Sequence, residues 1–350
     1  MENLARESEL LFIWDTRLSN PNGDMMSDNA NRFDEIDEKA IVSDVRIKRT
    51  IRDYLQYHKG YDKEIFVNND AILAGYDDKG TLKSVTAENR FNQIKEEFKM
   101  LEEVQAIYVE YEEKLNSKKD KKKLENERDT KLEKVIFLNC IDNRLFGGVA
   151  PKSGLQLIGA VQFSWTKSLN KTETVLSQGT GAFATESNEK GEAKFTKTFR
   201  VDNYIPYAIF PVYGTINRAN VKKCTTKEQD IQDMIEALWY GTKKLNTHTK
   251  MGQKPRLFLR IIYKENSNYF IGLLDELVNL KNSDEIRSLD EAEFDFSELI
   301  NSINNAKEFI EEVEIVFDSK MEKYKSALSK IEKVKFISET ELLKNRTNRE

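Results

Sequence analysis

The sequence predicts an α+β protein with a βαββαβ core, a helical insertion and a long β-hairpin. Three observations predict it. Short apolar runs alternate with amphipathic stretches at helical spacing over two separated parts of the chain. A highly charged stretch, residues 61–135, interrupts this alternation. A polar segment, residues 171–203, separates two apolar runs and is too long for a simple turn.

The first two core elements are a strand over residues 10–15 and a helix over residues 43–57. The run LLFIWD is compact, apolar and short enough for a buried strand. Ser43 is a natural N-cap, and Gly60 stands where the helix should end. Apolar residues at helical spacing predict one buried helix face, made of Ile47, Ile51, Tyr54 and Leu55.

The insertion 61–135 is predicted to be mostly helical. One helix is expected from Asn89 to Leu115 and another from about Leu124 towards Leu145, ending at Gly147. The lysine-rich residues 118–123 between them are expected to form a solvated connector.

The remaining core elements follow the insertion. Strands are expected over residues 155–166, 203–214 and 256–263, with a helix over 227–245 before the last strand. With the first strand and helix, this order is the ferredoxin-like, RRM-like βαββαβ pattern. The segment 171–203, which holds Gly179, Gly181 and Gly191, is predicted to be a projecting β-hairpin.

This order gives the expected domain organisation. Residues 1–60 and 136–275 form the core, with the hairpin inside it, and 61–135 form the insertion. Residues 276–350 are expected to be a C-terminal α/β extension packed on the core. Within it we expect a helix over 319–331 and short strands near 312–317 and 333–338.

The distribution of charge is more informative than the net charge of −5. Residues 1–142 hold 24 basic and 31 acidic side chains, 143–270 hold 19 and 10, and 271–350 hold 12 and 19. A basic middle in an acidic chain is typical of a groove that binds a polyanion. The alternative is that these basic residues are spread over several solvated faces.

Several classes of protein are disfavoured. Two cysteines, Cys140 and Cys224, are too few for a disulfide framework and fit a reducing compartment. No uninterrupted apolar run approaches the roughly 18 residues that a membrane helix needs, so we expect a cytoplasmic protein with no membrane association. The two histidines, His58 and His248, lack metal-ligand spacing, and no Walker A, Rossmann or nucleophile-elbow motif occurs. We therefore expect no cofactor and no metal.

RNA binding would have to use loops and the first helix, since the RNP1 aromatic motif is absent. The Asn-rich loop after the first strand offers amides, and the helix offers cations and an N-terminus that can receive a phosphate. The loop before the last core strand adds further polar groups, and in a βαββαβ fold these segments can converge. The candidates from this reasoning are Asn20, Asn22, Ser43, Arg46, Lys48, Arg49, Arg52, His248, Lys250, Gln253 and Lys254.

At these residues the chain resembles a known family. The pairing of NPNGD (20–24) with VSDVRIKRTIRDY (42–54) is similar to the backbone subunit of CRISPR type I effector complexes, in the repeat-associated mysterious protein superfamily, and most similar to type I-B. Asp142-x-Arg144, Phe199-Arg-Val-Asp202 and Met251-Gly-Gln253 extend the match in order over roughly residues 9–275. Residues 61–135 and 280–350 carry no motif of the family.

The resemblance implies a non-catalytic RNA-binding protein that polymerises along a CRISPR RNA in an antiviral surveillance complex of the Cascade type. It implies a palm, a helical finger and a thumb hairpin near 171–203 that kinks the guide. It also implies guide contacts by Ser43, Lys48, Arg49 and Arg52, with further RNA-binding positions in the hairpin at Phe183, Lys197 and Arg200. Expected partners are guide RNA, target DNA through the guide, further copies of the chain, and the handle-binding, large and small subunits.

Two alternatives remain open from the residues. Related type III subunits cut target RNA from the loop after the first strand, and this loop holds the acids Asp24, Asp28, Asp34, Glu35 and Asp37. A metal-dependent ribonuclease is therefore one alternative, although short acidic residues also serve turn chemistry. The other alternative is a monomeric single-strand RNA chaperone.

Overall fold

The computed structural model of the protein describes residues 4–68, 86–117, 121–151, 153–184, 197–284 and 286–343. Its central sheet has the strand order β10-β11-β1-β12-β15-β16, and β8 pairs with the far end of β11. Neighbouring strands are antiparallel except β15 and β16. The strands are β1 (Ser8–Ser19), β8 (Val161–Phe163), β10 (Val175–Ala184), β11 (Lys197–Ile216), β12 (Lys254–Tyr263), β15 (Ile310–Phe317) and β16 (Val334–Phe336).

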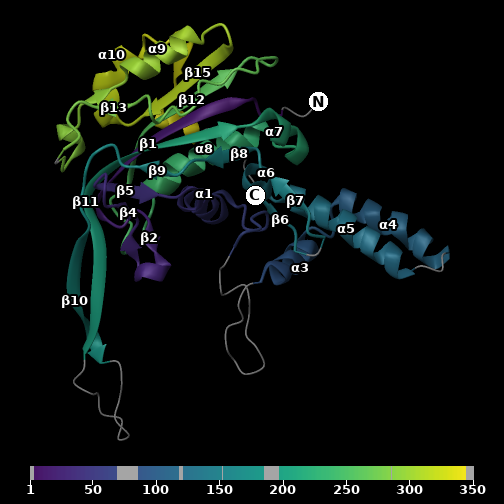
Figure 1. Ribbon diagram of the computed structural model, residues 1–350. Helices are drawn as coiled ribbons and strands as arrows, with labels where there is room; N and C mark the ends of the chain where they lie inside the picture. The colour runs from purple at the N-terminus through teal and green to yellow at the C-terminus, as the bar shows by residue number, and fades with distance from the viewer. Residues whose placement is uncertain are drawn as a thin grey trace, which may run out of the picture.

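The sheet is covered on both faces, which explains why β1 is an uninterrupted apolar run. Leu10, Phe12 and Trp14 lie in one buried cluster, and Leu11 and Ile13 lie in the other. Figure 1 shows α1 and α8 on one face, and α9 and α10 on the other. These helices are α1 (Asp44–Lys59), α8 (Glu228–Lys243), α9 (Ser297–Asn305) and α10 (Lys325–Leu328).

Helix α1 has the predicted ends and the predicted buried face. Ser43 is the N-cap residue, and Gly60 ends the helix in the left-handed conformation, with φ of 76°. Ile47, Ile51, Tyr54 and Leu55 are all buried. The Ser43 side chain, however, makes no capping hydrogen bond to the helix. Its hydroxyl is used elsewhere, as described below.

Small strands connect β1 to α1 beside β11 (Figure 1). β2 pairs with β3 around a 3-10 turn, and β5 pairs with both β4 and β9. The bounds are β2 (Gly23–Asp24), η1 (Met25–Ser27), β3 (Ala30–Asn31), β4 (Phe33–Asp34), β5 (Lys39–Val42) and β9 (Thr166–Lys167).

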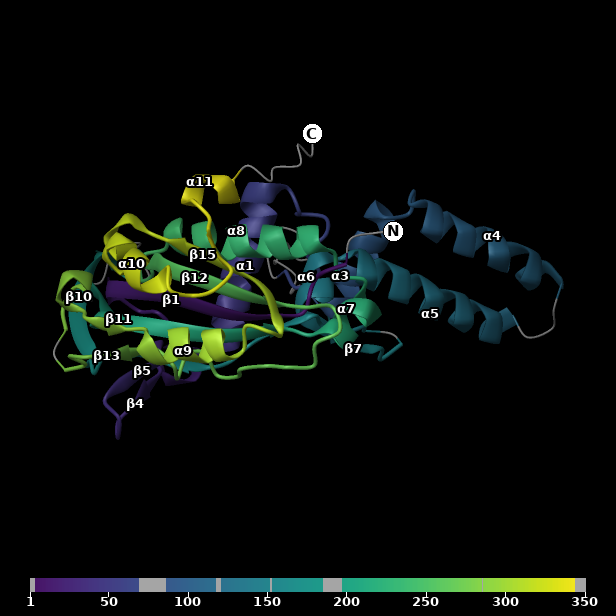
Figure 2. The same cartoon turned by 90° about the horizontal axis from the view of Figure 1, so that it is seen from above.

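The insertion is helical and has its own core. α4 and α5 lie side by side and extend away from the sheet (Figures 1 and 2). The expected single helix 89–115 is wrong, because a turn at 98–101 divides it and Phe98 packs into the insertion core. Residues 121–123 of the expected solvated connector are exposed as predicted but begin α5 instead, and residues 118–120 lie outside the described ranges. The helices are α3 (Ala87–Glu97), α4 (Glu102–Ser117) and α5 (Lys121–Asn139).

Two further elements that were expected to be continuous are broken. The second helix of the insertion stops at Asn139, and α6 (Ile141–Phe146) begins anew after Cys140. Arg144 Nη1 donates to the carbonyls of Leu138 and Asn139, at 3.0 Å each, and so caps the end of α5. The expected strand 155–166 is divided at Gly159, where a Cβ would lie 2.3 Å from the backbone nitrogen of Gly147. Its two pieces are β7 (Gln156–Ile158), paired with β6 (Gly147–Val149), and β8.

The expected hairpin is present. β10 pairs with the first part of β11, from Val175 opposite Tyr204 to Ala184 opposite Lys197. The second part of β11 pairs with β1 from Ile205 to Ile216. One strand therefore belongs to both the hairpin and the central sheet, and Figure 1 shows the hairpin projecting from the body.

The C-terminal segment is part of the central sheet. β15 pairs with β12, and the strands expected near 312–317 and 333–338 are β15 and β16. The expected helix 319–331 is a 3-10 helix followed by the short α10. The remaining elements are α7 (Arg218–Cys224), β13 (Asn279–Leu280), η2 (Leu289–Glu291), β14 (Phe294–Asp295), η3 (Ser319–Tyr324) and α11 (Glu339–Leu342).

Candidate nucleic-acid interface

The loop after β1 is fastened to the N-terminus of α1. Asn22 Oδ1 accepts hydrogen bonds from the backbone nitrogen of Ser43, at 3.1 Å, and from its hydroxyl, at 2.9 Å. This explains why Ser43 does not cap its own helix. Asn20 and Asn22 are 3% and 6% exposed, so both amides stabilise the loop from within.

The loop before β12 lies against the same place. The backbone nitrogen of Asn20 donates to the carbonyl of Thr249, at 2.7 Å, and Lys250 Nζ donates to the carbonyl of Asn20, at 3.1 Å. Gly252 has φ of +95°, and a Cβ there would lie 2.7 Å from the carbonyl oxygen of Arg17. Only glycine lets the loop approach the end of β1 this closely.

Arg46 joins the three segments. Its Nε donates to the carbonyl of Pro21, at 3.1 Å, and its Nη2 donates to Gln253 Oε1, at 3.1 Å. Burial lowers the pKa of Arg46 to about 10. Burial and the nearby charge of Arg46 lower the pKa of Lys250 to about 8. Two cations therefore lie close together, and the hydrogen bonds described for them go to carbonyl, hydroxyl and amide oxygens, which favours an anionic ligand.

The structure thus brings together six of the predicted positions: Asn20, Asn22, Ser43, Arg46, Lys250 and Gln253. Four of them are more than nine-tenths buried. Gln253 Nε2 and Asn20 Oδ1 are buried without a hydrogen-bond partner among the described residues. We call this group the loop–helix junction.

Other predicted positions surround the junction and are exposed. His248 Nε2 lies 3.5 Å from Asp202 Oδ1 on β11, and 65% of its side chain is exposed. Lys254 is exposed at the start of β12. Arg49 is half exposed and pairs with Asp53, at 2.6 Å.

Lys48 and Arg52 have partners inside the protein, which the sequence analysis did not expect. Lys48 Nζ donates to Asp44 and to Gln162, at 2.9 Å each. Arg52 Nε donates to the fully buried Asp142, at 2.9 Å, and its guanidinium lies 5.1 Å from the centre of the Phe146 ring. Arg52 therefore has a structural role, and we do not count it among the exposed cations.

Phe183, Lys197 and Arg200 lie on the paired strands of the hairpin. Their side chains lie outside the described part of the chain. RNA binding by these three residues stays a prediction.

The carboxylates of the acidic loop that have described partners lie against basic side chains. Asp34 and Asp37 both pair with Lys167, at 2.6 and 2.7 Å, and Asp24 lies 3.5 Å from Arg32. The hydrogen bond from Lys167 lowers the pKa of Asp34, and this bond in turn raises the pKa of Lys167. Asp28 ends η1 in the left-handed conformation, and Glu35 is exposed. Within the described ranges, no group of three or more His, Cys, Asp or Glu could hold a metal ion.

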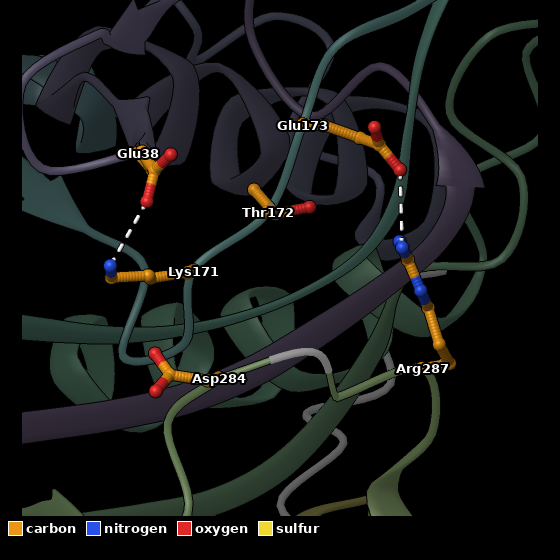
Figure 3. Close-up of a pocket in the computed structure, with 6 residues that line it drawn as sticks. All are labelled: Glu38, Lys171, Thr172, Glu173, Asp284 and Arg287. Atoms are coloured by element: carbon orange, nitrogen blue, oxygen red, sulfur yellow. Dashed lines mark hydrogen bonds and ion pairs between the residues drawn. The ribbon is translucent and has the colours of Figure 1, made fainter.

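A pocket of about 440 Å³ lies at the base of the hairpin and holds none of the predicted RNA-binding residues (Figure 3). Glu38 pairs with Lys171, at 2.9 Å, and Glu173 pairs with Arg287, at 3.1 Å. The backbone nitrogens of Lys171 and Thr172 donate to the carbonyls of Ser283 and Glu38, and so hold the segment that leads into β10. These contacts fix the base of the hairpin to the two loops beside it.

Trp165 and Arg32 were not among the residues predicted to bind RNA, although both lie beside the loop–helix junction. Trp165 was included in an apolar strand, but it lies beyond the break in that strand and is 56% exposed. The Arg32 guanidinium carbon lies 5.7 Å from the centre of its ring. Alternation through Val161 and Phe163, which are both buried, would instead predict a buried Trp165, so no pattern in the sequence indicates its exposure.

Three comparisons with known proteins agree with one another. The model of the family described as CRISPR-associated protein Cas7 matches residues 6–98 and 87–297. The CRISPR-associated protein Cas7 of Haloferax volcanii is 28% identical over 339 residues, which are 90% of this chain and 88% of that protein.

Two solved structures have a similar fold. One is a chain of a CRISPR RNA-guided surveillance complex in a pre-nicking state, with a TM-score of 0.54, 13% identity, and coverage of 97% of this chain and 98% of that chain. The other belongs to a CRISPR RNA-guided surveillance complex, with a TM-score of 0.50, 12% identity, and coverage of 97% of both chains. Among the helices that the structure describes, none is long and apolar enough to cross a membrane.

Proposed function

The chain belongs to the family of the CRISPR-associated protein Cas7, and from this membership we propose that it is a CRISPR RNA-binding backbone subunit. In this proposal several copies assemble along one guide RNA in an antiviral surveillance complex. Each copy holds the guide by its backbone, and the guide bases remain available to pair with target DNA.

The loop–helix junction is the observation that carries the proposal. It joins the loop after β1, the start of α1 and the loop before β12 through Arg46 and Asn22. Arg46 and Lys250 place positive charge there and donate hydrogen bonds to neutral oxygens, while His248, Arg49 and Lys254 are exposed around it. Cations and amides bind phosphates without reading sequence, as a protein that holds many different guides requires.

We infer a palm of the ferredoxin-like type for this family member. The antiparallel order β8-β11-β1-β12, with α1 and α8 packed together on one face, supports this assignment. In the same proposal the β10–β11 hairpin is the thumb and α3 to α5 are the finger. The C-terminal strands β15 and β16 widen the palm sheet.

We propose that the subunit is not an enzyme. A ribonuclease that acts through the loop after β1 would need carboxylates free to bind a metal. Here Asp34 and Asp37 share Lys167, and Asp34 also accepts two backbone N–H bonds of a turn. These contacts support turn chemistry as the function of the acidic residues.

We also propose a complex type, a set of partners and a cellular location for the subunit. The motifs over residues 20–24 and 42–54 support assignment to type I, and within it to type I-B. The proposed partners are guide RNA, target DNA through the guide, further copies of the chain, and the handle-binding, large and small subunits. The proposed location is the cytoplasm.

Reconstitution on RNAs of increasing length tests the proposal. We expect the number of copies per RNA to rise in proportion to RNA length, measured by light scattering of the purified complexes and by electron microscopy. One copy on every RNA would instead indicate a monomeric RNA chaperone. Adding complementary RNA and magnesium to the same complexes should leave that RNA intact, whereas its cleavage would indicate a ribonuclease.

A further inference from the structure

Trp165 is an exposed aromatic residue next to the loop–helix junction. The strand register places Ile41 opposite Lys167 and Val42 opposite Thr166. Trp165 directly precedes this paired segment, and Ser43, the N-cap residue of α1, directly follows its partner strand. The chain has three tryptophans, and the other two, Trp14 and Trp239, are 2% and 1% exposed. Trp165 is 56% exposed, which leaves a large apolar ring facing water.

The backbone on either side of Trp165 is held firmly. The backbone nitrogen of Ser164 donates to the carbonyl of Tyr213, at 2.9 Å, and the hydroxyl of Thr166 donates to the carbonyl of Pro211. Trp165 itself lies between β8 and β9, outside both strands, and its side chain is exposed whereas Thr166 is buried. The ring is thus presented on a fixed support.

Arg32 adds a cation with few described partners beside this ring. Its guanidinium carbon lies 5.7 Å from the centre of the Trp165 ring, and its Nη2 lies 3.5 Å from Asp24 Oδ1. Its Nε, and both side-chain amide atoms of the neighbouring Asn31, are buried without a hydrogen-bond partner among the described residues. The backbone nitrogen of Arg32 donates to the carbonyl of Asn22, at 3.1 Å, which ties this cation to the junction.

We propose that Trp165, with Arg32 beside it, is a stacking site for one unpaired nucleobase of the guide RNA. The inference rests on the proposed function and adds a base-binding position to a surface that otherwise binds phosphates. An exposed indole beside a guanidinium is the arrangement by which single-strand-binding proteins hold bases. Stacking uses the flat face that every base has, so the site tolerates any guide sequence.

Tryptophan fluorescence gives a direct readout, because Trp165 is the exposed indole of the three. We expect a short single-stranded oligouridylate to change the fluorescence of the wild-type chain and to protect it from quenching by iodide. Trp165→Phe keeps an aromatic ring and should bind the RNA with little loss, but without the fluorescence change. A change that persists in Trp165→Phe would overturn the proposal.

Binding by Trp165→Ala tests the energetic contribution. We expect its Kd for the oligouridylate to rise by about 5- to 150-fold, the range for loss of one base–aromatic stack. The matched control is Tyr57→Ala: Tyr57 is 57% exposed and lies near the other end of α1, about 20 Å from Ser43 along the helix. Its affinity should equal that of the wild type.

An abasic oligoribonucleotide of the same length separates stacking from charge. It keeps the phosphates, so Trp165→Ala and the wild type should bind it equally. Equal loss with both oligonucleotides would overturn the stacking site, and so would unchanged affinity of Trp165→Ala for the oligouridylate.

A fluorescence change that depends on protein concentration without RNA would assign Trp165 to a contact between copies instead. Failure of the wild type to bind any RNA would overturn the proposed function itself.

Discussion

The surroundings of Lys250 destabilise its protonated form. Burial and the nearby Arg46 lower its pKa to about 8 from an ordinary value of 10.5. A phosphate at Lys250 Nζ would favour the protonated form, so the affinity for RNA should fall as the pH rises from about 7 to about 9. Measurement of Kd by fluorescence anisotropy at both pH values checks this.

The control for Lys250 uses two substitutions. Lys250→Met should bind more weakly at low pH and lose this pH dependence, with a salt slope smaller by about 0.7. Lys320→Met removes an exposed lysine that pairs with Asp290 in the C-terminal segment, and should keep the wild-type dependence. The same pH dependence in Lys250→Met would contradict the assignment.

The lowered pKa of Lys250 also has a consequence for stability. The folded chain loses this proton near pH 8, whereas the unfolded chain keeps it to about its ordinary value of 10.5. Because the unfolded state then binds more protons, this group makes folding more favourable as the pH rises between these two values.

Arg52 and Arg49 lie on the same helix but should differ in their effect on stability. Arg52→Ala removes the cation that pairs with the fully buried Asp142, and should lower the free energy of unfolding by about 3 kcal/mol. Arg49→Ala breaks a half-exposed pair with Asp53 and should cost less than about 1 kcal/mol. Urea unfolding measures both.

The same pair of variants separates folding from RNA binding. In buffer without urea, where both variants are folded, Arg52→Ala should bind RNA with the affinity of the wild type, because Arg52 is not an exposed cation. Arg49→Ala should bind RNA more weakly. A greater loss of RNA affinity in Arg52→Ala than in Arg49→Ala would show that Arg52 contacts the guide.

At the scale of elements, we expect the central sheet to fold without the β10–β11 hairpin, whereas the hairpin needs the sheet to hold its base. β1 pairs with β11 from Ile205 onward, whereas β10 pairs with the residues before it. Replacing residues 177–202 with a short turn should therefore leave a folded protein that binds RNA but does not form regular filaments. Loss of the cooperative thermal transition would show that the hairpin belongs to the core.

At the scale of the whole molecule, the C-terminal segment shares a sheet and a buried cluster with the core. β15 pairs with β12 along seven residue positions, and one buried cluster joins β1 and β12 to residues 274–331. A chain truncated after residue 275 would expose this cluster and the edge of β12. We expect it to aggregate or to lack a cooperative thermal transition, measured beside the hairpin deletion, which should keep one. A soluble, cooperative truncated chain would restore the division at 275.

Local patterns in the sequence determined the elements and their approximate ends. Helix α1 follows from Ser43, Gly60 and the spacing of its apolar residues, because caps and periodicity act within a few residues of one another. The convergence of the loop after β1, α1 and the loop before β12 also followed from the order of elements. The hairpin followed from the length and composition of its segment.

Only the tertiary structure decided which side chains are partners and which face water. Arg52 and Asp142 are 90 residues apart in the chain, and Lys48 and Gln162 are 114 apart. Likewise, Trp165 follows the buried Phe163 by two residues, yet it lies between β8 and β9 and is exposed. Periodicity in the sequence indicates which face of a helix or strand is buried. The interaction energy of a charged side chain, however, depends on its distance in space to other charges, which the fold sets. Pairing, exposure and pKa are therefore properties of the packed chain.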